Sequence, residues 1–161
     1  MTSDECRAYL LRPHDGEVYG ESLFGALATG TTDEDRRHKW RVLARLERET
    51  KERITAVLDR AGIVIPGSSA SVQRGEADAR RLSRVPWRDV MEGFRRELER
   101  FVTEFERAEA LESSGREVGD LLRHITNHER ALLEFVTREL EDRSEHSLQP
   151  VLALLRNPNV R

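Results

Sequence analysis

Several features are scarce or missing in this sequence. A single cysteine, Cys6, rules out a disulfide within the chain. No apolar run is long enough to span a bilayer, and the first residues, M-T-S-D-E-C-R, lack the basic start and apolar segment of a secretory signal. There is also no glycine-rich phosphate loop, no G-x-S-x-G and no C-x-x-C pair. We therefore expect a cytoplasmic protein with no membrane partner, and the sequence assigns it to no enzyme class.

An excess of positive charge is absent as well. The chain has 27 lysines and arginines against 30 acidic residues, a formal net charge of -3. Arginine alternates with glutamate, as on solvated helix faces that carry ion pairs. Aromatic residues are only 6% of the chain, and they do not alternate with a basic patch as a nucleic-acid surface requires. We expect no nucleic-acid partner.

Helical periodicity is present over most of the 161 residues. Apolar residues recur at i, i+3, i+4 and i+7 in four long stretches, which predicts four helices, within about 15–28, 33–61, 86–112 and 117–141. Residues 1–14 are expected to be flexible, and 142–161 to form a short fifth helix and a tail. The region 63–75, rich in Gly, Ser and Pro, predicts a loop followed by a short helical turn at E-A-D-A-R-R-L. The domain prediction is thus an all-α bundle over 15–141.

Some polar residues fall on the apolar faces of these helices. On a projection of about 100° per residue, Glu47 lies inside the apolar stripe of the second predicted helix, with Thr50 nearer its centre. His128 and Glu129 lie inside the stripe of the fourth. A buried carboxylate must be paired, hydrogen-bonded, protonated or bound to metal. Carboxylates with imidazole suit iron, manganese or zinc.

The first predicted helix adds Glu17 or Glu21, and the pattern leaves its phase open. If Leu23 and Leu27 point inward, Glu21 points away; if Phe24 does, Glu21 joins the core. We take Glu21 as the candidate ligand. Glu97, on the third predicted helix, lies at the edge of the stripe and is a weaker candidate.

Three segments, G-E-S-L-F-G-A-L-A, L-A-R-L-E-R-E-T and N-H-E-R-A-L-L-E-F, resemble the ferritin-like, rubrerythrin-type four-helix bundle over about residues 15–141. The resemblance implies an up-down four-helix bundle in which one helix of each pair supplies a Glu and the other Glu-x-x-His, together binding two metal ions. Glu21 matches the first Glu. Thr50 stands where the motif has His, and Ile125 stands where it has Glu. The di-metal motif is therefore degenerate.

Two interpretations remain open. A single ion of iron, manganese or zinc could be held by Glu21, Glu47, His128 and Glu129. Alternatively, the core is free of metal and its buried Glu and His side chains form a hydrogen-bonded network, which is the state we expect. The protein would then be a helical scaffold or interaction module that acts as a homo-oligomer.

A second resemblance ranks lower. Bundle proteins of the DinB/YfiT type bind one metal ion through three histidines, two of them in H-x-x-x-H. His124 and His128 match that spacing, but His38, the third, lies outside its apolar stripe. We expect His124 to face solvent or an interface.

The predicted fifth helix carries an apolar strip, which can pack on its own bundle or bridge to a second subunit. Packing on its own bundle is the simpler outcome. We expect the protein to be a homodimer. The strip consists of Leu148, Val151, Leu152 and Leu155.

Overall fold

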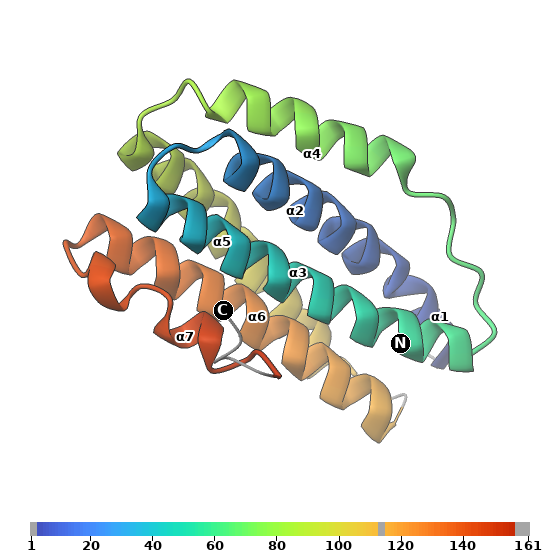
Figure 1. Cartoon of the computed structure of the whole chain (residues 1–161). Helices are drawn as coiled ribbons and strands as arrows, with labels where there is room; N and C mark the ends of the chain where they lie inside the picture. The colour runs from blue at the N-terminus through green and yellow to red at the C-terminus, as the bar shows by residue number, and fades with distance from the viewer. Residues whose placement is uncertain (1–2, 113–114, 157–161) are drawn as a thin grey trace.

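The fold is given by a computed structural model, which describes residues 3–112 and 115–156 (Figure 1). Within these ranges there is no strand, so the all-α prediction is confirmed. None of the described helices is long and apolar enough to cross a membrane. The elements, in chain order, are α1 (Ser3–Tyr9), α2 (Leu11–Gly30), α3 (Glu34–Arg60), α4 (Ser69–Leu82), α5 (Trp87–Ala110), α6 (Arg116–Leu140), the 3-10 helix η1 (Ser144–His146) and α7 (Gln149–Leu152).

The four long helices form two antiparallel pairs, α2 with α3 and α5 with α6 (Figure 1). The first pair is joined by residues 31–33. Asp33 caps α3, since its Oδ1 accepts a hydrogen bond from the Arg36 backbone N–H at 2.9 Å. Gly62 follows α3 with φ +69°, the left-handed conformation that glycine adopts at helix ends. Ser113 and Ser114, predicted to end the third helix, lie outside the described residues.

A long crossover connects the two pairs. The chain returns along α2 as α4, so α3 and α5 begin at the same end of the bundle (Figure 1). Near these two helix starts, the rings of Trp40 and Trp87 lie 5.0 Å apart. The expected up-down alternation therefore holds within each pair, and the middle connection departs from it.

Helix α4 was not expected at its full length, because residues 63–75 read as a loop. Its buried face consists of Ser71, Gly75 and Ala79, small residues that an apolar pattern does not reveal. A Cβ atom at position 75 would lie 2.8 Å from the Tyr19 carbonyl oxygen, so only glycine allows α4 to approach α2 this closely. The small residues on its buried face therefore allow α4 to pack closely on α2 and to cover it.

The N-terminal segment also contains a helix that the apolar pattern did not predict. Residues 3–9 form α1, and α2 begins at Leu11 rather than near residue 15. Cys6 and Leu10 are fully buried against the bundle. The Cys6 thiol donates a hydrogen bond to Glu112 Oε2 at 2.7 Å. The segment that we expect to be flexible thus contains a short helix and two side chains packed on the bundle, and its flexibility stays a prediction.

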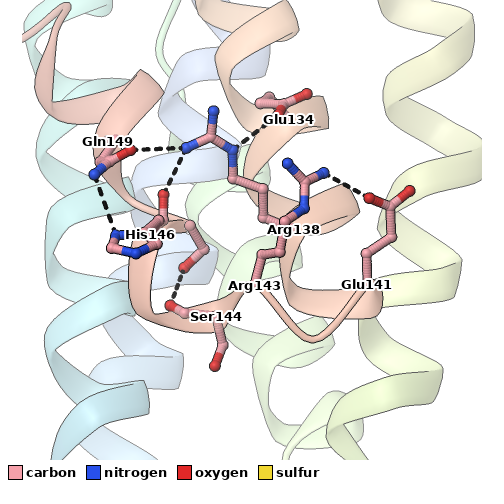
Figure 2. A network of polar contacts seen from close by, with 8 residues as sticks. Glu134, Arg138, Glu141, Arg143, Ser144, His146 and Gln149 are labelled. Carbon is pink, nitrogen blue, oxygen red and sulfur yellow. Dashed lines mark hydrogen bonds and ion pairs between the residues drawn. The ribbon is translucent and has the colours of Figure 1, made fainter.

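At the other end, Arg138 organises the turn after α6 (Figure 2). Its guanidinium donates to the His146 carbonyl oxygen at 2.8 Å, to Gln149 Oε1 at 3.1 Å and to Glu134 Oε1 at 2.8 Å. The turn brings α7 back onto α6 and α3, and Val151 becomes fully buried. The C-terminal apolar strip thus packs on its own bundle, and the homodimer stays a prediction.

The core contains two apolar clusters separated along the helix axes. One surrounds Trp40 and Phe135, and the other surrounds Ile54 and Leu122. On α3 the gap between them falls after Leu46, and on α6 it falls after Ile125. Buried polar side chains occupy this intermediate layer.

Candidate metal centre

Three helices bring Glu17 of α2, Glu47 of α3 and His128 of α6 into one cluster. One ligand atom of each residue lies within 4.8 Å of the others. The His128 Nε2 atom is 3.2 Å from Glu47 Oε1, and its Nδ1 atom is 3.7 Å from Glu17 Oε2. All three are buried, with 1–5% of their surface exposed. The carboxylates and the imidazole therefore meet away from bulk water.

Thr50 fixes the orientation of the His128 ring. Its hydroxyl lies 2.9 Å from His128 Nδ1 and 3.1 Å from His124 Nε2, so it joins the two imidazoles. His124 is therefore half-buried and bonded inside the bundle, contrary to the expectation that it faces solvent or an interface. Burial, followed by the nearby charge of Arg53, lowers the pKa of His124 to about 4. It is neutral at physiological pH.

The cluster and its surroundings contain more acidic groups than basic ones. Burial and then the neighbouring Glu47 carboxyl group raise the pKa of Glu17 well above its ordinary value. Burial raises the pKa of Glu129 to about 7, and the opposing effect of His128 does not cancel it. Burial would lower the pKa of His128, but the Glu47 carboxylate outweighs it and raises that pKa. Three carboxyl groups thus share one histidine, and a bound cation would relieve their repulsion.

Glu17 has an unused ligand atom. Its Oε2 is buried and has no hydrogen-bond partner within the described part of the chain. A buried oxygen of this kind costs free energy unless something binds it. Because it faces the His128 ring, it is available to a cation shared with Glu47.

Gly20 allows the helices to meet here. A Cβ atom at this position would lie 2.6 Å from Glu47 Cδ, inside van der Waals contact. The glycine therefore leaves space for the Glu47 carboxylate against the backbone of α2.

Glu21 is not part of the cluster, so its choice as the ligand of the first helix needs correction. Its carboxylate pairs instead with Lys51 and with Arg48, the latter at 2.8 Å. Burial would raise the pKa of Glu21, but the hydrogen bonds from Arg48 and Lys51 lower it. Leu23 and Leu27, which represent one possible phase of this helix, and Phe24, which represents the other, are all buried. The buried face of α2 is therefore wide enough to include Glu17. The available signal was the seven-residue spacing from Glu17 to Phe24, which places them on one face.

The other candidate residues from the sequence are not part of the three-residue cluster either. Glu129 is buried beside His128 but is not one of the three residues whose ligand atoms converge. Glu97 and His38 are exposed and lie outside the cluster. The structure therefore brings together Glu47 and His128 with Glu17, a residue the sequence left as an alternative.

Comparison with known proteins adds no relative, since no family model matches the chain and neither a curated protein nor a solved structure does. Function is therefore argued from the site itself. Two carboxylate oxygens and an imidazole nitrogen, held in a buried layer, form a donor set that suits a divalent transition-metal ion.

Proposed function

We propose that the protein is a ferritin-like bundle that binds one divalent transition-metal ion in its core, through Glu17, Glu47 and His128. The observation that carries the proposal is the buried Glu17 Oε2, which lacks a hydrogen bond within the described residues and belongs to a side chain with a ligand atom within 4.8 Å of those of Glu47 and His128. A divalent cation would use this oxygen and offset two buried carboxylates. Iron, manganese and zinc all accept these donors.

One ion is favoured over two because two of the ligands expected in the di-metal motif are missing. Thr50 and Ile125 stand where the resemblance places a histidine and a glutamate. Thr50 instead hydrogen-bonds His128, as the residues that orient metal ligands commonly do. Ile125 is fully buried in the apolar core and offers no donor atom.

The test is elemental analysis of protein purified without chelator or an affinity metal. We expect about one ion per chain in the natural protein and a loss of most of it in Glu17→Gln. Glu21→Gln is the matched control, because it changes a carboxylate on the same helix that lies outside the cluster. It should retain the metal.

The proposal fails if the natural protein binds no iron, manganese or zinc after incubation with each ion and desalting. It fails equally if Glu17→Gln and Glu21→Gln retain the same amount. Either outcome favours the metal-free network, in which His128 is held by Thr50 and Glu47 alone.

Gly20→Ala tests the same site from the backbone side. The added methyl group should displace the Glu47 carboxylate and weaken metal binding roughly tenfold or more, as loss of ligand positioning typically does. A competition titration against a chromophoric chelator measures this effect. Gly25→Ala is the control, since a Cβ atom there meets nothing within 4 Å. Equal metal affinity in the two variants would contradict the packing argument.

A further inference from the structure

Next to the polar cluster lies a cavity of about 530 Å³. It is lined by residues of α2, α3, α4, α5 and α6, and its volume is within the range of small-molecule sites, about 300–1,000 Å³. Exposed side chains such as Arg12, Arg74 and Glu97 line its outer part, so the cavity reaches the surface. Glu17, Glu47 and Glu129 line its buried part.

The walls of this cavity are aromatic. The chain has only five phenylalanines, and every one lines the cavity: Phe24, Phe94, Phe101, Phe105 and Phe135. Tyr19 adds a sixth ring. Aromatic faces attract cations as well as apolar groups, because the ring quadrupole is negative above its plane.

The lining is also acidic. Apart from Glu17 and Glu47, the proposed metal ligands, five of its residues are Asp or Glu and two are Arg, namely Arg12 and Arg74. Both arginines are engaged: Arg12 pairs with Glu104 at 2.8 Å, and the Arg74 guanidinium lies 4.8 Å from the centre of the Tyr19 ring. The potential inside the cavity therefore favours a positively charged molecule.

Glu129 adds an independent observation. It is 92% buried (8% exposed) and lines the cavity, and in the described ranges its carboxyl group has no hydrogen bond or ion pair, although the charges of His128, Glu47 and Glu104 act on it. It is not one of the three residues assigned to the metal. A buried acid without a partner is costly in the folded protein, and a ligand that donates to it would remove this cost.

We propose that the cavity binds a hydrophobic amine, whose ring system packs among the phenylalanines and whose ammonium group faces Glu129. A carboxylate-bearing molecule would be repelled by the lining. A neutral hydrocarbon would fill the space but leave Glu129 without a partner. Glu129 and the aromatic walls are not among the three proposed metal ligands, although Glu17 and Glu47 line the same cavity.

The test is isothermal titration calorimetry of the full chain, as purified, with three naphthalene compounds of similar shape. 1-Naphthylmethylamine is the cationic probe, 1-naphthalenemethanol the neutral one and 1-naphthaleneacetate the anionic one. We expect the amine to bind about tenfold or more tighter than the alcohol, in line with the value of a charged hydrogen bond. The acetate should show no binding.

Glu129→Gln should remove the preference for the amine over the alcohol, while Glu97→Gln, at the exposed end of the cavity, should keep it. Thermal denaturation confirms that both variants are folded. Equal affinity for amine and acetate, no amine binding, or an unchanged preference in Glu129→Gln would overturn the inference. Metal content is recorded on the same samples, so absence of metal and absence of amine binding are seen separately.

Discussion

Replacement of Glu139 by alanine should lower the free energy of unfolding by about 3 kcal/mol, as removal of one member of a buried ion pair does. The Glu139 carboxylate pairs with Lys39 Nζ at 2.6 Å, and both side chains are only 4–5% exposed. It also accepts hydrogen bonds from Trp87 Nε1 at 2.9 Å and from the Ser147 hydroxyl at 2.6 Å. The variant leaves Lys39 with only the exposed Asp35 as a partner.

This effect should be large because Glu139 joins elements that are far apart in the sequence. Its partners come from α3, from the start of α5 and from the turn before α7, so its loss loosens one whole end of the bundle. Burial would lower the pKa of Lys39, but the hydrogen bonds that its ammonium group donates to Asp35 and Glu139 raise it, so this lysine is charged in the folded protein.

Equilibrium unfolding in urea measures the change. Glu141→Ala is the control: its carboxylate pairs with Arg143 at the surface, where both side chains are about half exposed, and its loss should cost at most about 0.5 kcal/mol. Comparable losses in the two variants would show that the buried network contributes no more than a surface pair.

Glu129→Gln should have the opposite effect and stabilise the metal-free protein at neutral pH. The pKa of Glu129 is raised from its ordinary 4.5 to about 7, and one pKa unit corresponds to about 1.4 kcal/mol. Below about pH 4.5 the carboxyl group is protonated in both the folded and unfolded states, so burial costs nothing extra. Above about pH 7 it is ionised in both, and the folded state bears a penalty of roughly 3 kcal/mol.

The stabilisation by Glu129→Gln should therefore be small near pH 5, grow to about pH 7 and then stay constant. Urea unfolding of both proteins between about pH 5 and pH 8, in the presence of chelator, measures it. Glu97→Gln, at an exposed position, should change stability by no more than about 0.5 kcal/mol throughout. A stability difference between Glu129→Gln and the natural protein that does not vary with pH would show that ionisation of Glu129 does not destabilise the folded state.

If Glu129 destabilises its own fold as we expect, its presence calls for a reason outside folding. Polar groups that violate the rules of core packing are concentrated at functional sites. The cost assigned to Glu129 accords with the amine site proposed for its cavity, and the buried Glu17 oxygen accords with the metal site.

The four long helices could be predicted from the sequence, because apolar spacing, the cap at Asp33 and the stop at Gly62 are local features. Helices α1 and α4 could not. The contacts that α4 makes with α2 depend on small residues such as Gly75. Small side chains give no periodic apolar signal, although they permit the closest packing.

The site was predictable in part for the same reason. Glu47, His128 and Glu129 stand out as polar residues within an apolar stripe, and all three are buried. Glu21 was predicted in place of Glu17 because the prediction gave α2 one narrow buried face, and the buried face of this helix is wider. The contact of Thr50 with His124 joins residues 74 positions apart, and no spacing rule predicts it.

By itself the sequence determined an all-helical chain and the polar side chains that must enter its core, because helical periodicity acts over only a few residues. The tertiary structure alone decided which of these side chains meet. The close approach of α2 to α3 at Gly20 left room for the Glu47 carboxylate beside Glu17 and His128, and an aromatic cavity lies between the helices beside Glu129. Helix rotation and packing distance are set by contacts between distant segments, and a local pattern does not contain them.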